Sequence, residues 1–223
     1  TCRRWRAAFF VLASLASLTW AFAGVLTPAM SQLHAFVSEY SARDQPWRYL
    51  FQTTDVIMGT LLCLAGLATL VWARHRPLGR QGWSGVGFVA GGFFSVLDAL
   101  VTMDCSPTRS QACMAAEEAG HVSVNHIVHV GTSTIVVVGF ALPILLLNST
   151  MTRFRGFGLV VTWAWVVFTL LNGIGAVGWF VGTPMDYTGI WQRFSLGLGT
   201  LWWLILAADD IVTARVQDRA RSC

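Results

Sequence analysis

Residues 121–147 read HVSVNHIVHVGTSTIVVVGFALPILLL, a run that contains no Asp, Glu, Lys or Arg. A membrane-spanning helix needs about 20 consecutive, mostly apolar residues, so this stretch is long enough to cross a bilayer. Further apolar runs of similar length lie on both sides of it. The six predicted spans lie near residues 7–27, 51–73, 84–103, 120–147, 158–182 and 193–212.

The composition supports the same fold class. Hydrophobic residues make up 55% of the 223 residues and charged residues only 12%, whereas about 25% of the residues in a soluble domain are charged. Six spans use about 120 residues, which leaves almost nothing for a separate extramembrane domain. The sequence therefore predicts a single all-α, polytopic integral membrane domain over 1–223, and it excludes a soluble domain, a coiled coil and a disordered chain.

The arginines indicate the orientation. All 15 basic residues are arginine, and cytoplasmic loops of membrane proteins carry an excess of Lys and Arg. With both termini in the cytoplasm, the arginines left outside are only Arg43, Arg48, Arg109 and Arg193. This placement explains the net charge of +4 without a nucleic-acid partner. Ala21-Phe22-Ala23 also matches a signal-peptide cleavage site. We nevertheless expect the first span to be retained, because the N-terminal arginines then lie on the same, cytoplasmic side of the membrane as the arginine-rich loops.

Two cysteines bracket the loop between the third and fourth predicted spans. This topology places Cys105 and Cys113 on the oxidising side of the membrane, where disulfides persist. We therefore expect a disulfide between them. A metal site that uses both thiols is the weaker alternative, because no CxxC spacing accompanies them.

The fourth span carries a polar stripe. A helix turns 100° per residue, and six polar side chains fall on one arc of it, opposite a face of Val, Ile and Gly: His121, Asn125, His126, His129, Thr132 and Ser133. Polar groups are costly in hydrocarbon. The stripe is therefore expected to face protein or water rather than lipid.

Carboxylates are predicted at the depth of this stripe. At 1.5 Å per residue, Asp98 and His126 both lie about 8–9 Å below the outer surface. Asp55 is about four residues inside the second span. We therefore expect Asp55, Asp98, His126 and His129 to meet in one buried cluster just beneath the outer leaflet.

Such a cluster permits three kinds of chemistry. Imidazoles and a carboxylate are zinc ligands, so His126, His129 and Asp98 are candidate metal ligands, with Asp55 as a catalytic base for metal-dependent hydrolysis. Without a metal, the same groups could handle protons or hold the spans together by hydrogen bonds. Haem is not expected, because axial histidines must come from facing helices and three of the five histidines share one span.

Five polar residues around the cluster are assigned to substrate binding: Ser38, Glu39, Asn125, Ser133 and Arg193. Ser38 and Glu39 are expected to rim a cavity, and Arg193 is a candidate for holding a lipid phosphate or pairing with an acid. Asp209 and Asp210, near the inner end of the last span, are expected to be solvated terminal charges.

Short motifs along the chain resemble those of a known family. They are Phe36-Val37-Ser38-Glu39-Tyr40 ahead of Leu50-Phe51 and Gly59, then Leu97-Asp98 through Met103-Asp104-Cys105, then Cys113, His121, His126 and His129, and finally Gly189 with Gln192-Arg193. Together they resemble the bacterial and archaeal membrane family catalogued as domain of unknown function 998, over about residues 8–212. The resemblance implies a six-helix protein of a prokaryotic cytoplasmic membrane, without a settled activity.

The combination of buried Ser, Asp and His also resembles the alkaline ceramidase and progestin-receptor-like hydrolases. This chain departs from them in having six spans rather than seven and in lacking their paired histidines in a last span. Two main hypotheses follow. The protein is a metal-dependent hydrolase or transferase of an outer-leaflet lipid, or it binds membrane lipids or a partner without catalysis. Proton-coupled transport is a third interpretation.

The predicted topology is tested by cysteine labelling in whole cells. A thiol reagent that does not cross the membrane should label Ser110→Cys directly, and Leu78→Cys only after the cells are permeabilised. The reverse pattern would contradict six spans with cytoplasmic termini.

Overall fold

The computed structural model describes residues 2–73, 79–181 and 187–222. Within these ranges the chain forms α- and 3-10 helices and no strand. The long helices are α1 (Cys2–Ser17), α3 (Arg48–Ala73), α4 (Arg80–Leu100), α6 (Val124–Leu147), α7 (Arg155–Phe180) and α8 (Thr188–Ser222). The short ones are η1 (Leu18–Phe22), α2 (Ala23–Leu26), η2 (Val37–Ser41), α5 (Gln111–Glu118) and η3 (Asn148–Thr150).

In the described part of the chain, six helical segments are long and apolar enough to cross a membrane. The first of them runs from Arg3 to Leu26, so α1, η1 and α2 together form one span. The predicted all-α, six-span fold class is thereby confirmed.

The start of the fourth span was predicted too early. α6 begins at Val124 rather than near residue 120, because Gly120 has a φ of +69° and Ser123 is the N-cap residue, its hydroxyl accepting a hydrogen bond from the amide of His126. A helix cannot continue through a residue in the left-handed region. His121 therefore lies in the preceding loop, where it is exposed, and it does not belong to the polar stripe.

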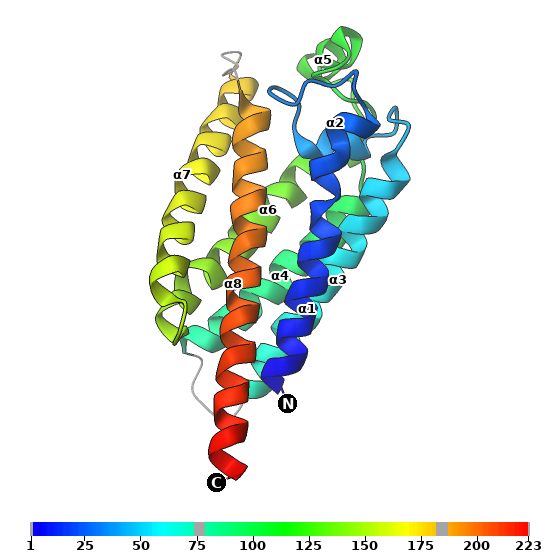
Figure 1. The fold of residues 1–223 in the computed structure, drawn as a ribbon. Coiled ribbons are helices and arrows are strands. Elements are labelled where there is room, and N and C mark those ends of the chain that lie inside the picture. Colours follow the sequence, from blue (N-terminus) through cyan, green and yellow to red (C-terminus); the bar gives the residue numbers. More distant parts are fainter. Residues whose placement is uncertain (1, 74–78, 182–186, 223) are drawn as a thin grey trace.

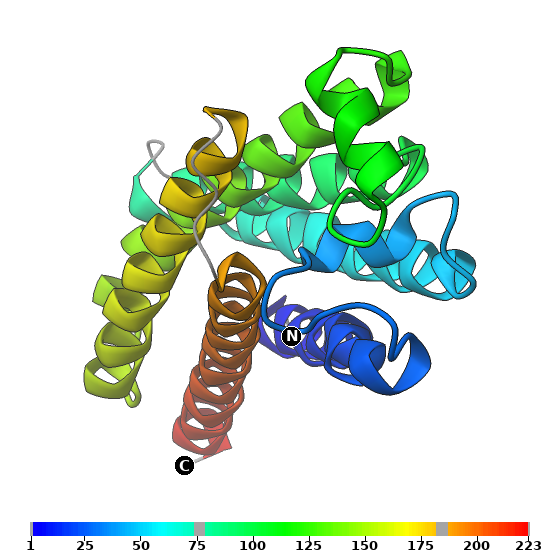
Figure 2. The ribbon, with the colours of Figure 1, turned by 90° about the horizontal axis from the view of Figure 1, so that it is seen from above.

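The six long helices form a bundle in which neighbours in space differ from neighbours in sequence. They pack in the order α7, α8, α1, α3, α4, α6, which Figure 2 shows from above. α6 crosses the bundle obliquely, and η3 at its end contacts α7. Both chain termini lie at one end, here called the terminal end, while α5 lies at the opposite end, here called the capped end (Figure 1).

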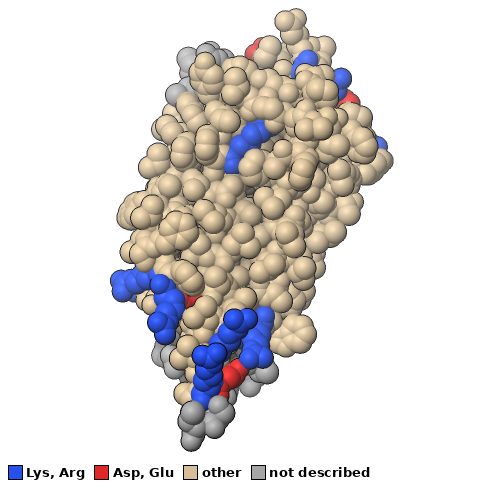
Figure 3. Space-filling model, viewed as in Figure 1, with Lys and Arg blue, Asp and Glu red and all other residues tan. Residues whose placement is uncertain are grey.

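The outer surface has the composition expected beside lipid. Large apolar side chains are exposed on the membrane-spanning segments, including Val25 at 82%, Trp163 at 64% and Val138 at 61%. Figure 3 shows a face that is almost free of charge over most of its height, with basic side chains gathered at the terminal end. Of the two positions chosen for labelling, Ser110 lies in the loop before α5 at the capped end, and Leu78 lies outside the described residues.

Glycines allow α3, α4 and α6 to approach closely. A Cβ atom on Gly92 would lie 2.5 Å from the carbonyl oxygen of Gly59, and one on Gly139 would lie 2.6 Å from the amide nitrogen of Gly91. Side chains at these positions would collide with backbone, which cannot move aside as a flexible side chain can. Small residues therefore set the helix spacing here, as they do in many membrane proteins.

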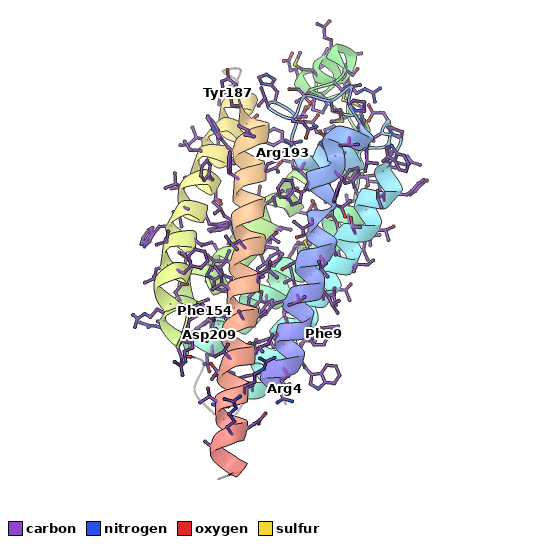
Figure 4. The ribbon with its side chains drawn as sticks, viewed as in Figure 1. Arg4, Phe9, Phe154, Tyr187, Arg193 and Asp209 are labelled. Carbon is purple, nitrogen blue, oxygen red and sulfur yellow. A yellow bond between two sulfur atoms is a disulfide. The ribbon has the colours of Figure 1, made fainter. Side chains whose placement is uncertain are left out.

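The terminal end is held by buried ion pairs, which corrects the expectation for Asp209 and Asp210. Asp210 is 0% exposed and accepts two hydrogen bonds from Arg6, at 2.7 and 2.6 Å, and one from Arg3 at 3.0 Å. Asp209 is 2% exposed and accepts from the amides of Arg153 (2.7 Å) and Thr152 (3.0 Å), just before α7. Figure 4 shows Asp209 beside Phe154. Both carboxylates are buried because α8 continues to Ser222, ten residues beyond the predicted end.

The glycine contact predicts a stability difference within one helix. Gly139→Ala should destabilise the protein by about 1–3 kcal/mol, because the added methyl group forces α4 and α6 apart. Gly131→Ala, on the same helix but with open space around it, should be neutral or stabilising by up to about 1 kcal/mol. Thermal unfolding of the two purified variants measures the difference; equal stabilities would contradict the close contact.

Candidate functional site

The capped end is organised around one buried carboxylate. Glu39 lies in η2 and is 1% exposed. It accepts hydrogen bonds from the amide of Phe36 (2.9 Å), from the hydroxyl of Ser106, and from the amide (3.1 Å) and hydroxyl (2.6 Å) of Thr108. Burial raises the pKa of Glu39, and these hydrogen bonds partly oppose that effect. Glu39 therefore joins the loop after α2 to the loop after α4.

The segment after α2 is also hydrogen-bonded to the start of α8. Arg193 is 7% exposed and donates to the carbonyls of Ala35 and Gly189, both at 2.9 Å, and to the hydroxyl of Tyr40 at 3.1 Å. Gln192 accepts a hydrogen bond from the backbone amide of Val37. The guanidinium predicted to hold a lipid phosphate thus lies among backbone carbonyls at the capped end (Figure 4).

Asp104 and the disulfide connect α4 to α6. Cys105 and Cys113 form a disulfide between the loop and α5. Asp104 accepts hydrogen bonds from the amide (2.6 Å) and the hydroxyl (2.8 Å) of Ser123. Although burial opposes the change, these hydrogen bonds and the nearby Arg43 hold the pKa of Asp104 below its usual value. The carboxylate thereby fixes the residue at which α6 begins.

His126 belongs to this capped end. It is 1% exposed, and its Nδ1 accepts a hydrogen bond from the amide of Asp104 at 3.3 Å. Its Nε2 therefore carries the proton in the neutral ring, and this atom lies 3.9 Å from a carboxylate oxygen of Glu117 on α5. Its nearest acidic groups are thus Asp104 and Glu117, not Asp98.

Asp98 and His129 form a separate junction between α4 and α6. The Nδ1 of His129 lies 2.8 Å from the carbonyl oxygen of Val101, 3.1 Å from that of Asp98 and 3.3 Å from the Asp98 carboxylate. Carbonyl oxygens only accept, so Nδ1 donates and satisfies the carbonyls left free where α4 ends. The Asp98 carboxylate also accepts from the hydroxyls of Thr132 and Ser133.

The predicted four-residue cluster is thus divided. The structure brings Asp98 and His129 together, but His126 faces the capped end, and within the described residues Asp55 makes no hydrogen bond or ion pair with any of the three. Among the described residues, no three His, Cys, Asp or Glu side chains are placed to hold a metal ion. The residues present therefore do not fit the expected zinc site, which needs at least three protein ligands.

Asn125 and Ser38, two of the residues assigned to substrate binding, do not line the Asp55 cavity described below. Asn125 is exposed on α6, and Ser38 contributes its backbone carbonyl to a hydrogen bond from Ser41. Ser133 is occupied by Asp98, at 3.0 and 3.1 Å from its two carboxylate oxygens.

A cavity of about 130 Å³ lies among α1, α3, α6, α7 and α8. Most of its lining is apolar or aromatic, and Asp55 of α3 is the acidic residue in it. Asp55 lies seven residues into α3, about 10 Å along the helix from the capped end. Of the four residues in the predicted cluster, only Asp55 reaches this cavity.

Two tryptophans in the wall of this cavity were not predicted as site residues. The indole nitrogens of Trp20 and Trp203 are buried, and neither has a hydrogen-bond partner among the described residues. A buried indole N–H usually finds an acceptor. Their signal in the sequence is weak, because they are two of 11 tryptophans and most tryptophans in membrane proteins are interfacial anchors or core residues.

A comparison with protein families confirms the family that the sequence motifs resemble. The model of the family described as "Protein of unknown function (DUF998)" matches residues 10–209, which include Glu39, Asp98, His126 and Arg193. A comparison with curated proteins found no match, and neither did a comparison with solved structures. Because the family model covers most of the sequence, the chain belongs to the DUF998 family of membrane proteins of unknown function.

Proposed function

We propose that this protein binds a lipid-like molecule within the membrane, in the cavity that contains Asp55, and that it does so without catalysis by the histidines. The observation that carries this proposal is the cavity itself, an apolar space with one carboxyl group and two unpartnered indole N–H groups in its wall. Binding sites for small molecules typically combine a mostly apolar lining with a few polar groups that fix orientation.

The position of the cavity favours a guest that comes from the bilayer. Val137 of α6 and Leu196 of α8 line it, and each is 38% exposed on the lipid-facing surface. The backbones of α6 and α8 are not closely packed in the described chain; large side chains bridge them, such as Phe140 and Trp203 with ring centroids 5.5 Å apart. An apolar tail can therefore enter from the side, between these two helices.

The orientation forms part of the proposal. The terminal end, where the basic side chains gather (Figure 3), faces the cytoplasm of a prokaryotic cell. The capped end, with its disulfide, faces the opposite and oxidising side. Asp55 then lies in the outer half of the membrane, so the guest is an outer-leaflet molecule.

The hydrolase hypothesis has less support. His126 and His129 are 1% and 2% exposed, and neither lines the cavity. The Nδ1 of His129 is occupied by the end of α4, and that of His126 by the amide of Asp104. The Asp98–His129 junction is therefore better explained as a hydrogen-bonded connection between α4 and α6.

Filling the cavity tests the proposed function. Val136→Phe should reduce the amount of lipid-like molecule that copurifies with the protein, because the larger side chain occupies the space of the guest. Val138→Phe, on the lipid-facing side of the same helix with Val138 61% exposed, is the matched control and should retain it. Native mass spectrometry of the purified proteins measures the bound mass. Equal occupancy in both variants, or none in the unmodified protein, would contradict the proposal.

A second experiment distinguishes a structural role of His129, as a link between α4 and α6, from a role in metal-dependent hydrolysis. His129→Ala should destabilise the protein by about 1–3 kcal/mol, because it leaves buried carbonyls at the end of α4 without a donor. His121→Ala, in the exposed loop, should change stability by no more than about 0.5 kcal/mol. Thermal unfolding measures both, and elemental analysis of the unmodified protein should find no stoichiometric zinc. Zinc that is bound by the unmodified protein and lost in His129→Ala would restore the hydrolase hypothesis.

A further inference from the structure

Most polar groups in the wall of the Asp55 cavity already have partners within the protein. The hydroxyls of Ser17 and Thr200 lie 3.0 Å apart, that of Ser195 lies 2.6 Å from Thr169, and that of Thr54 donates to the carbonyl of Leu50 at 3.0 Å. Among the described residues, the Asp55 carboxyl forms no hydrogen bond or ion pair, and the indole N–H groups of Trp20 and Trp203 are buried without an acceptor. Trp203 is 5% exposed, so bulk water does not satisfy its N–H group.

Asp55 lacks a counter-charge of its own. In the part of the chain that the structure describes, no arginine or histidine forms an ion pair with it, and the charged group with which it interacts is Asp98, another carboxyl. An ionised carboxylate in the membrane interior needs a partner of opposite charge. The described chain provides no such partner, and a cation that enters the cavity would supply it.

The remaining wall is suited to a cation. Five of the lining residues are aromatic: Trp20, Phe51, Phe140, Trp165 and Trp203. The faces of aromatic rings attract cations, and aromatic cages recognise quaternary ammonium groups. Apolar aliphatic side chains would serve a purely hydrocarbon guest equally well, so an aromatic wall beside a carboxylate favours a charged one.

The volume of the cavity and its two indole N–H donors further restrict the class of guest molecule. A volume of about 130 Å³ is close to the roughly 150 Å³ of a cavity that holds benzene, so it accommodates a group of a few heavy atoms rather than a whole lipid. The two indole N–H groups need an acceptor, such as a hydroxyl or ester oxygen beside the cation. Among the described residues, no arginine lines the cavity, so a phosphate group would remain unbalanced beside Asp55.

We propose that the guest is an organic cation, a protonated amine or quaternary ammonium group with a neighbouring oxygen and an apolar tail, and that Asp55 is its counter-ion. This inference rests on the proposed function and names the class of molecule that the cavity takes. The cationic group lies against Asp55 and the aromatic rings, the oxygen accepts from Trp20 and Trp203, and the tail leaves between α6 and α8.

A matched pair of ligands tests the charge. The cationic probe is dodecyl-dimethyl-(2-hydroxyethyl)ammonium, and the neutral probe is its analogue with carbon in place of nitrogen. Titration calorimetry of the full chain in a maltoside detergent should show the cationic probe binding about tenfold more tightly, a difference of about 1.4 kcal/mol. Choline, which has the same head but no tail, should bind more weakly than the tailed cation.

Variants locate the effect at the cavity. Asp55→Asn should lower the affinity for the cationic probe about tenfold and leave that for the neutral probe unchanged. Asp218→Asn, at an exposed acid on α8, is the control and should change neither. Trp203→Phe keeps the ring but removes the N–H group, so it should weaken both probes a few-fold while the preference for the cation remains. If Asp55→Asn fails to fold, the comparison of the cationic and neutral probes in the unmodified protein still tests the preference for a cation.

Different binding results contradict the cationic guest and the lipid-binding function. Equal affinity for the cationic and neutral probes, or a preference that survives in Asp55→Asn, overturns the inference but leaves a lipid-binding function in place, provided Val136→Phe still abolishes binding. Binding of neither probe, together with an empty cavity by native mass spectrometry, overturns both. Choline binding as tightly as the tailed probe overturns the assignment of a tail.

Discussion

Hydrocarbon offers no hydrogen-bond partners, so a polar group inside the bilayer has to be satisfied by the protein. The structure follows this constraint closely. Asp98 accepts from Thr132 and Ser133, while His129 donates to the end of α4. At the terminal end, Asp210 is bound by Arg6. Asp55 departs from this pattern, because the described chain provides no hydrogen bond or ion pair for its carboxyl, which lies in a cavity wall beside the unpartnered N–H groups of Trp20 and Trp203.

The cavity results from two different kinds of helix packing. Glycines bring the backbones of α3, α4 and α6 into contact, as Gly59, Gly92 and Gly139 show. On the other side of the bundle, large rings such as Trp165, Phe140 and Trp203 span the distance between α6, α7 and α8. These three rings also line the cavity, and Asp55 reaches it from α3.

The sequence predicted the fold well because the signals for it are local. The length of the apolar runs is sufficient to identify six spans. The predicted depth matched Asp98 with His126, whereas the structure pairs Asp98 with His129, one turn further along α6. The direction of a side chain is harder to predict. His126 lies one turn from His129 but faces Glu117 on α5, a short helix that no periodic pattern indicated.

Other errors arose where the long-range path of the chain decides burial. Asp209 and Asp210 were expected to be solvated because they lie near the inner end of the last predicted span, but Arg6 binds Asp210 and the loop before α7 surrounds Asp209 with amides. Likewise, the N–H groups of Trp20 and Trp203 belong to residues far apart in sequence that meet at one cavity. No spacing rule relates such positions, so only the packed structure identifies them together with Asp55.

The role of Asp55 is tested most directly by an experimental structure of the protein in a lipid bilayer, determined finely enough to show side chains and bound molecules. We expect an elongated guest in the cavity among α1, α3, α6, α7 and α8. Its polar end should lie within hydrogen-bond reach of Asp55 and Trp203, and its tail should leave between α6 and α8. A cavity closed by side chains, or one that holds only water around Asp55, would contradict it.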